Sequence, residues 1–349
     1  MKDIKTIGDI EERVKLARRE DLSREDWQIL VKDRSKKVKL TLAQNPTCPE
    51  WVLEKLSQDQ NQEVRFFIAE HPHCPPAVLE FLSRNEEWWV RQVVAAHPQC
   101  PPAVLESLSL DKKWEVRQSV ALNPECPPSL LELLSRDKES KVRGEVAQHR
   151  QCPTSVLESL SRDKDWSVRK TVAQHPQCPV SVLQKLSLDD DSRVREQVAR
   201  HPQCPPAVLE FLSRDEEWWV RQVVASHPQC PVSVLERLSP DEDWYWSVKI
   251  AVASHPQCPI SLLETLSRDE KWLVRQVVAA HPQCSESILK TLIQDEDEGV
   301  VQAVLSRADL TLAVIEAGLK GKNKLKVESG LKANPNTKRL VRNFLQQER

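Results

Sequence analysis

Glycine is scarce in this 349-residue chain: there are six, and only Gly144 and Gly299 fall in its regular part. A loop that cradles phosphate needs glycines for close backbone approach, so no nucleotide-binding loop of that kind is expected. Long apolar runs are also missing, including at the start, which reads MKDIKTIGDIEERVK. A signal peptide or a membrane-spanning helix needs such a run. We therefore expect a cytoplasmic protein without a membrane segment.

An excess of charge of one sign is missing too. The chain has 50 lysines and arginines against 52 aspartates and glutamates, for a net charge of -2. This balance gives no general attraction to nucleic acid or to an anionic membrane. Neither partner is expected from composition alone.

What the chain has in abundance is a repeat, which its ten cysteines make visible. The spacing is 26 residues from Cys48 to Cys230, Cys258 comes two residues late, and Cys284 resumes the spacing. The consensus of one unit is H-P-Q-C-P-P-x-V-L-E-x-L-S-x-D-x-x-W-x-V-R-x-x-V-A-x. A period of this length is typical of a solenoid, in which each unit buries its apolar face against its neighbours.

The repeat also predicts the domain organisation. We expect an N-terminal cap with one degenerate repeat over 1–44, ten tandem repeats over 45–306, and a degenerate C-terminal repeat with a cap over 307–349. Degenerate ends are expected because a terminal repeat exposes one face to water. We expect a monomer.

Each unit contains two short helical patterns, as residues 71–96 illustrate. Cys74 is expected to cap the first helix and Pro75 to open it. Val78, Leu79 and Leu82 then lie on one helical face, and the helix is expected to end at Ser83.

The second helix is predicted to begin at Asn85, where most other units carry Asp. Glu86-Glu87 would then lie in its first turn, where acids interact well with the helix dipole. Val90 and Val94 form its buried side, and the His97-Pro98 pair should end it, because a residue before proline is pushed out of the α region. The predicted fold class is therefore all-α, with α/α or α/3₁₀ helix pairs.

The run N/H-P-x-C-P-x-x-V-L-x-x-L-S-x-D-x-x-x-x-V-R-x-x-V-A resembles the leucine-rich repeat variant (LRV) family and, more widely, HEAT-like repeats. The resemblance implies paired short helices, alternately α and 3₁₀, in a right-handed superhelix. HEAT-like arrays are similar in a second respect, an Asp and an Arg six residues apart in each unit, such as Asp111 and Arg117. We interpret these residues as a ladder that ties neighbouring units together, ending where Val301 replaces the Arg.

The cysteine column could be read as a metal site, because His71 and Cys74 recur as a pair in most units. A structural zinc site needs four ligands close together, and each unit offers at most two. Asn replaces the His at Asn45 and Asn123, and Asn is a poor ligand for a soft metal. We therefore predict no metal and no cofactor, with the His or Asn holding a turn and the Cys filling a small cap. A thiol-based redox sensor stays open as an alternative.

A tryptophan column is the candidate binding feature. Trp88, Trp114, Trp166, Trp218, Trp244 and Trp272 are assigned to one repeat position, and Trp89, Trp219 and Trp246 lie beside it. Other units carry Ser, Gln or Glu there, so the position is not strictly a core position. Two interpretations remain: packing between repeats, or a stripe that binds a partner, because Trp is enriched in interface hot spots.

No unique pair of carboxylates or histidines interrupts the repeat, so we expect no catalytic residue and no enzyme. A protein-binding scaffold that uses its curved surface and the tryptophan column is the favoured function; the partner protein is not identified by the sequence. A HEAT-like nucleic-acid-processing or enzyme-associated module is the alternative. Nucleic acid is unlikely as a partner, because the two positions after each predicted cap of the second helix carry mixed charges with acids in excess, as in Glu86-Glu87 and Lys112-Lys113.

Overall fold

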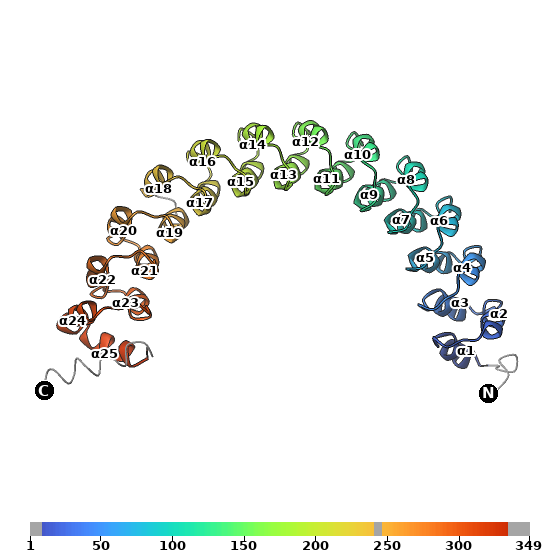
Figure 1. Cartoon of the computed structure of the whole chain (residues 1–349), viewed down its shortest axis with the longest axis horizontal. Coiled ribbons are helices and arrows are strands. Elements are labelled where there is room, and N and C mark those ends of the chain that lie inside the picture. Colours follow the sequence, from blue (N-terminus) through green and yellow to red (C-terminus); the bar gives the residue numbers. More distant parts are fainter. Residues whose placement is uncertain (1–8, 241–245, 334–349) are drawn as a thin grey trace. The chain divides into compact units, whose positions relative to one another are not determined.

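The protein was analysed as a computed structural model that describes residues 9–240 and 246–333. The chain divides into two compact units, Met1–Pro179 and Val180–Arg349, and each is described by itself. The described residues form 25 helices and no strand, and equivalent helices recur at intervals of about 26 residues (Figure 1). The predicted all-α solenoid is therefore confirmed. Both helices of each repeat are α-helices, while the handedness of the superhelix stays a prediction.

In the first unit, the first helices of the repeats are α2 (Arg24–Leu30), α4 (Glu50–Leu56), α6 (Pro76–Leu82), α8 (Pro102–Leu108), α10 (Pro128–Leu134) and α12 (Thr154–Leu160). The second helices are α1 (Ile10–Ala17), α3 (Lys36–Ala43), α5 (Gln62–Glu70), α7 (Trp88–Ala96), α9 (Trp114–Leu122), α11 (Ser140–Gln148) and α13 (Trp166–Gln174).

In the second unit, the first helices are α14 (Val180–Leu186), α16 (Pro206–Leu212), α18 (Val232–Leu238), α20 (Ile260–Leu266), α22 (Glu286–Leu292) and α24 (Leu312–Lys320). The second helices are α15 (Ser192–Arg200), α17 (Trp218–Ser226), α19 (Ser247–Ser254), α21 (Trp272–Ala280), α23 (Glu298–Leu305) and α25 (Lys324–Ala333).

Within each unit the helices form two rows. The odd-numbered second helices pack directly on one another, and most even-numbered first helices contact the second helices before and after them (Figure 1). Val78, Leu79 and Leu82 of α6 are buried, as are Val90 and Val94 of α7, so the apolar positions predicted from the sequence form the core between the rows. Helices of seven to nine residues are too short to be stable alone, and this packing supplies most of their stability.

The start of the first helix differs from the prediction. Pro75, not Cys74, is the N-cap of α6, with φ -63° and ψ 145°, and Pro76 is the first helical residue. The shift does not depend on a second proline, because Pro153 and Pro259 are extended N-caps as well, although Thr154 and Ile260 follow them. Cys74 thus lies outside the helix, and its backbone N–H donates to the carbonyl of His71 at 2.8 Å. The predicted ends at Ser83 and His97 are confirmed.

The start of the second helix also differs from the prediction. The helix α7 begins at Trp88 with Glu87 as its N-cap, so Asn85 lies two residues before the cap. The Asn85 side chain instead accepts a hydrogen bond from the N–H of Glu87 at 3.1 Å, which closes the turn before the helix. In other repeats the equivalent Asp accepts the same turn bond, so the turn alone places the residue ahead of the helix, and its carboxylate makes a second bond to an arginine or lysine of the preceding repeat.

That second bond forms the ladder. Arg117 donates from Nε and Nη2 to both carboxylate oxygens of Asp137, at 2.5 and 2.8 Å, and from Nη1 to the carbonyl of Asp111 at 2.7 Å. The arginine therefore ties the turn of its own repeat to the carboxylate of the next. Burial alone would raise the pKa of Asp137, but the hydrogen bonds from Arg117 and the Glu139 N–H outweigh it and hold that pKa below its ordinary value.

The interpretation of these residues as a ladder between neighbouring repeats is confirmed within each unit. Rungs of the same kind join Arg13 to Asp33, Lys39 to Asp59, Arg91 to Asp111, Arg143 to Asp163, Arg195 to Asp215, Lys249 to Asp269 and Arg275 to Asp295. The first of these extends the ladder to α1, ahead of the repeats assigned from the sequence.

A second ladder runs through the histidines. His97 Nε2 lies 3.1 Å from the carbonyl oxygen of His71, and its Nδ1 accepts from the N–H of Gln99 at 3.1 Å. This pattern requires a neutral ring with its proton on Nε2. Asn123 reproduces both contacts, because its amide nitrogen donates to the His97 carbonyl at 3.0 Å and its oxygen accepts from the Glu125 N–H at 2.9 Å. The predicted role of His or Asn in holding a turn is confirmed.

This exchange between His and Asn gives a prediction about pH. Burial, opposed by the contact with a carbonyl, lowers the pKa of His71 and His227 below 6.5. As the pH falls through 6.5 the unfolded chain takes up protons that the folded rings refuse, so stability is lost. The variant His71→Asn/His227→Asn should remain folded at pH 8 and lose less stability between pH 7 and 5, by up to about 1 kcal/mol per histidine and pH unit. Melting temperatures across this range measure the effect. An unchanged pH slope in the double variant would contradict the prediction.

Candidate functional site

The cysteine column contains no accessible site. All ten cysteines are free and buried, as predicted. Burial raises the pKa of every thiol, to about 12 for Cys74 and to about 11 for Cys126. A redox-sensing thiol needs an accessible sulfur and a lowered pKa. The burial of these cysteines and their raised pKa values therefore give no support to the redox-sensor alternative. Among the described residues, no three His, Cys, Asp or Glu side chains come together as a metal site.

The tryptophan column lies at the N-terminal ends of the second helices, where its half-buried rings contact the next repeat. Lys141 Nζ stands over the Trp114 ring at 4.4 Å from its centroid. The ring of Trp272 lies so close to Gly299 that a Cβ there would be 3.2 Å from it. The packing interpretation therefore accounts for part of the column. Trp272 still has 42% of its surface exposed.

One member of the column was assigned wrongly. The two extra residues of this repeat precede Trp246, which stands directly before Ser247 and α19, two residues before Val248. Trp246 therefore occupies the column position, while Trp244 lies outside the described residues. Lys271 Nζ stands 4.8 Å from the Trp246 ring centroid. The Trp246 backbone is left-handed, with φ 55°, a strained conformation for a bulky residue at the inserted turn.

Two tryptophans outside the column have a different environment. Trp89 lies one residue inside α7, with its ring centroid 5.5 Å from that of Phe66 on the preceding second helix. Trp219 holds the same position in α17 and lies edge-on to Trp218 at 5.8 Å. Both belong to the side of the second helices that faces away from the first helices. We call this side the second-helix face and define it by the residues equivalent to Trp89, Gln92, Val93 and Ala96.

Residues of the second-helix face change from repeat to repeat, while the core and ladder residues stay nearly constant. In the first unit the face residues of α5 to α13 are Glu63, Phe66, Phe67, Glu70; Trp89, Gln92, Val93, Ala96; Glu115, Gln118, Ser119, Leu122; Lys141, Gly144, Glu145, Gln148; and Ser167, Lys170, Thr171, Gln174. In the second unit those of α15 to α23 are Arg193, Glu196, Gln197, Arg200; Trp219, Gln222, Val223, Ser226; Ser247, Ile250, Ala251, Ser254; Leu273, Gln276, Val277, Ala280; and Gly299, Gln302, Ala303, Ser306.

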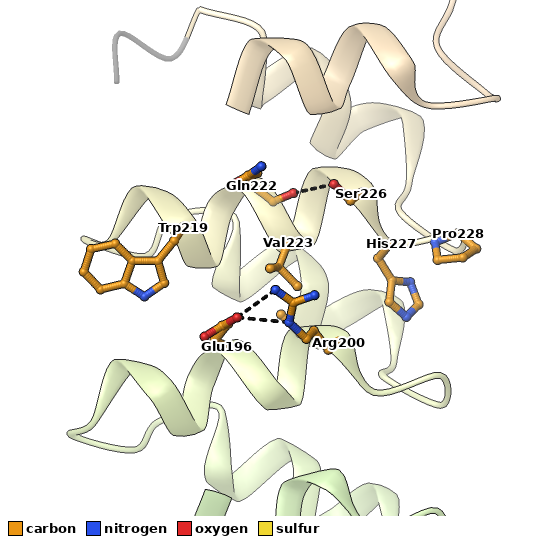
Figure 2. A pocket seen from close by; sticks show the side chains of 9 residues that line it. Glu196, Arg200, Trp219, Gln222, Val223, Ser226, His227 and Pro228 are labelled. Carbon is orange, nitrogen blue, oxygen red and sulfur yellow. Dashed lines mark hydrogen bonds and ion pairs between the residues drawn. The ribbon is translucent and has the colours of Figure 1, made fainter. Parts of the chain in front are cut away.

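A cavity of about 270 Å³ opens on this face between α15 and α17. Trp219 and Val223 supply its apolar wall, and Gln222 and Ser226 lie along the same helix (Figure 2). On the opposite side Arg200 donates to Glu196 at 2.8 and 3.0 Å, so the two charges neutralise each other. The cavity can therefore take an apolar side chain and offers polar groups at its edge.

A second cavity lies on the same face of the first unit, between α3 and α5. It has a volume of about 310 Å³ and is lined in part by Ala43, Phe67 and Glu70. Phe67 packs edge-on to Phe66 at 5.3 Å, and Phe66 contacts Trp89. Aromatic side chains thus gather on α5 and α7, with charged residues on the helices to either side.

The sequence analysis named Trp89 and Trp219 as candidates but missed the remaining apolar residues of this face. Phe66, Ile250 and Leu273 give no repeated signal, because they occupy positions that change from one repeat to the next. The signal that identifies them is variation: in a repeat, constant positions maintain the stacking and changing positions are free to serve a surface. Of the tryptophan candidates that the structure describes, six lie at the N-terminal ends of second helices, and Trp89 and Trp219 lie on the second-helix face.

Comparison with known proteins agrees with this architecture. The family model described as leucine rich repeat variant matches residues 114–139, 193–217 and 218–243. Among solved structures, a leucine-rich repeat variant described as having a novel repetitive structural motif is 28% identical, with a TM-score of 0.52; the match covers 64% of this chain and 87% of that one. The resemblance found in the sequence is thereby confirmed.

Two further structural matches are more distant. An engineered protein is 14% identical over 88% of this chain and 98% of its own, with a TM-score of 0.30. Importin beta is 13% identical over 92% of this chain and 46% of its own, with a TM-score of 0.21. Neither likeness says anything about function. No curated protein matches the sequence.

Among the described residues, no helix combines the length and the apolar character that crossing a membrane requires.

Proposed function

We propose that this protein is a non-enzymatic scaffold that binds partner proteins through its second-helix face. The observation that carries the proposal is the division of roles within the repeat. Buried apolar residues and the two ladders use nearly every constant position, whereas the face positions vary and include aromatic residues such as Phe66, Trp89 and Trp219, which are half-buried and so partly open to water. Partly exposed apolar residues gathered over several repeats are typical of protein interaction sites.

Trp219 and Trp89 are the proposed anchors, with the column tryptophans at the edge of the surface. A Trp in a pocket at the centre of an interface contributes large contact area at small entropic cost. The second-helix face of α17 offers such a pocket beside Trp219. Trp114, by contrast, is covered by Lys141 of the next repeat, so it acts mainly in packing.

The proposal predicts that Trp219→Ala and Trp114→Ala have different effects. Trp219→Ala should weaken binding of a partner by about 2 kcal/mol, roughly thirtyfold, with little change in melting temperature. Trp114→Ala should lower the melting temperature, because the cation–π contact and the packing between repeats are lost. Calorimetric melting and partner binding are measured on the same preparations.

The near-identical repeat 71–96 provides the matched control, since Trp89→Ala removes the equivalent side chain from the other aromatic cluster. Binding of a partner that contacts only one of the two aromatic clusters should be weakened by only one of the two variants. Unchanged binding of every captured protein by Trp219→Ala and by Trp89→Ala, after correction for the folded fraction, would contradict the use of this face.

A further inference from the structure

The second-helix face of the second unit carries no charge over four consecutive helices. None of the face residues of α17, α19, α21 and α23 is Asp, Glu, Lys or Arg. Trp219, Val223, Ile250, Leu273 and Val277 give this uncharged strip its apolar character. In the first unit only α7 is uncharged at these positions, because α5, α9, α11 and α13 each carry at least one charged face residue. The uncharged strip is therefore a feature of the second unit.

An acidic rim borders this strip at the N-terminal ends of its helices. The two residues directly before α15, α17, α21 and α23 together contain seven acids and one lysine: Asp190, Asp191, Glu216, Glu217, Glu270, Lys271, Glu296 and Asp297. The inserted repeat before α19 is left out of this count, because 241–245 lie outside the described residues. The equivalent pairs before α5 to α13 contain four acids and four lysines: Glu86, Glu87, Lys112, Lys113, Lys138, Glu139, Lys164 and Asp165. Charge thus distinguishes the two units.

Several of these carboxylates remain open to a partner. Glu216 and Glu270 are 81% and 80% exposed at their side chains. Arg193 pairs with Asp191 at 2.7 Å, Arg195 with Glu216 at 3.3 Å and Lys271 with Glu270 at 3.4 Å, so part of the acidic charge is compensated locally. Arg195 is shared with Asp215, which lies outside the rim. Eight carboxylates, the seven of the rim and Glu298, stand against these three cations, which leaves a negative excess beside the tryptophans.

We propose that the uncharged strip of α17 to α23 binds a peptide segment of a partner protein in which apolar residues stand next to lysine or arginine. The apolar side chains contact Trp219, Leu273 and Val277, one of them entering the cavity between α15 and α17. The cationic side chains reach the acidic rim, where carboxylates and half-buried indole rings meet. Cations bind the faces of indole rings, and three lysines of this chain already do so at Trp114, Trp166 and Trp246. This inference rests on the proposed function and specifies the partner segment.

The experiment selects peptides from a random library displayed on phage against the full-length protein. The recovered sequences should be enriched in lysine or arginine next to leucine, isoleucine or aromatic residues. A synthetic peptide of the enriched sequence should bind Glu216→Lys/Glu270→Lys about tenfold more weakly than the unaltered protein at low salt, with the difference shrinking at high salt because exposed charges are screened. Circular dichroism checks that the variants remain folded.

The twin repeat supplies the control for charge. Glu86 holds the same position as Glu216 and is 77% exposed, so Glu86→Lys changes net charge without altering the proposed rim and should leave affinity unchanged. Leu273→Ser tests the strip itself and should weaken binding at every salt concentration.

The possible outcomes separate this inference from the general function. Two outcomes would overturn the charge preference and leave protein binding intact. In the first, the peptides depend on Trp219 and Leu273 but lack basic residues. In the second, their affinity is unchanged by Glu216→Lys/Glu270→Lys. Peptides that bind Trp219→Ala and Leu273→Ser as well as they bind the unaltered protein, or the recovery of no peptide at all, would overturn both.

Discussion

Replacing Arg117 by alanine is expected to destabilise the first unit by about 3–5 kcal/mol, the cost typical of leaving one member of a buried ion pair alone. The side chains of Arg117 and Asp137 are only 8% and 7% exposed. Removal of the guanidinium leaves the Asp137 carboxylate with the Glu139 N–H as its remaining hydrogen-bond donor. The carbonyl of Asp111 loses its donor as well.

Arg117→Lys should cost clearly less, because the chain already uses lysine in two rungs. Lys39 binds Asp59 at 2.5 Å and Lys249 binds Asp269 at 2.9 Å. The lysine ammonium supplies the positive charge but lacks the planar guanidinium, which binds both carboxylate oxygens at once. One carboxylate oxygen therefore loses its hydrogen-bond partner, and the loss of stability should be intermediate. Exposed Arg136→Ala is the second control and should stay within about 0.5 kcal/mol of the unaltered protein.

Urea unfolding followed by circular dichroism measures the overall loss, and hydrogen exchange at α9 and α11 shows where it falls. Local measurement matters because a long repeat array need not unfold in one step. Equal stability of Arg117→Ala and Arg136→Ala would mean that the rung contributes nothing measurable.

The sequence predicted the fold well because each constant position has one physical role. Val78, Leu79 and Leu82 recur with helical spacing, and all are buried. The two ladders could be anticipated from polar residues that recur in every unit, since a charge conserved among repeats at one position must have a partner at another. Even the degenerate repeat was recognisable, because Trp27 stands at a Leu position and is buried.

Helix starts were less predictable, since they depend on competition for the same side chain. Asn85 and its Asp equivalents look like N-caps in sequence, yet their side-chain oxygens close the turn two residues ahead of the helix, and the Asp carboxylates also form the rungs with arginine or lysine. Cys74 lies one residue before the observed cap, because the proline that follows the cysteine is extended with or without a second proline after it.

The candidate site was harder to predict than the fold, because its residues do not recur. Trp88 and Trp114 stood out by repetition, and part of that repetition reflects packing between repeats. Ile250 and Leu273 were invisible to a search for constant positions. Only the structure shows that these varying positions lie together on one side of the second helices.

One rung of the ladder lacks its carboxylate, and supplying it by substitution is expected to have the second large effect on stability. Arg65 faces Asn85, which replaces the usual Asp, and the Arg65 Nε is buried without a hydrogen-bond partner. Its Nη2 reaches only the exposed Glu86, at 3.5 Å. The near-identical repeat 201–226 has Asp215 at this position, and there the Nε and Nη2 of Arg195 bind both carboxylate oxygens at 2.6 and 2.9 Å.

Asn85→Asp should therefore stabilise the first unit by about 1–3 kcal/mol, the usual cost of one unsatisfied buried polar group. The turn before α7 is preserved, because the Glu217 N–H donates to Asp215 at 3.0 Å just as the Glu87 N–H donates to Asn85 at 3.1 Å. The reciprocal Asp215→Asn should destabilise the second unit by about 3 kcal/mol, because a buried guanidinium loses its carboxylate.

Hydrogen exchange at α5 and α7 for Asn85→Asp, and at α15 and α17 for Asp215→Asn, measures the two effects in opposite directions. Gln60→Glu, which adds the same charge on an exposed side chain, controls for net charge and should change little. The two repeats differ at only three positions, so the two variants make opposite changes in almost the same repeat. Unchanged protection in both variants would mean that Asn is as good a partner as Asp for the buried arginine, and that the charge of the rung is not what stabilises the stack.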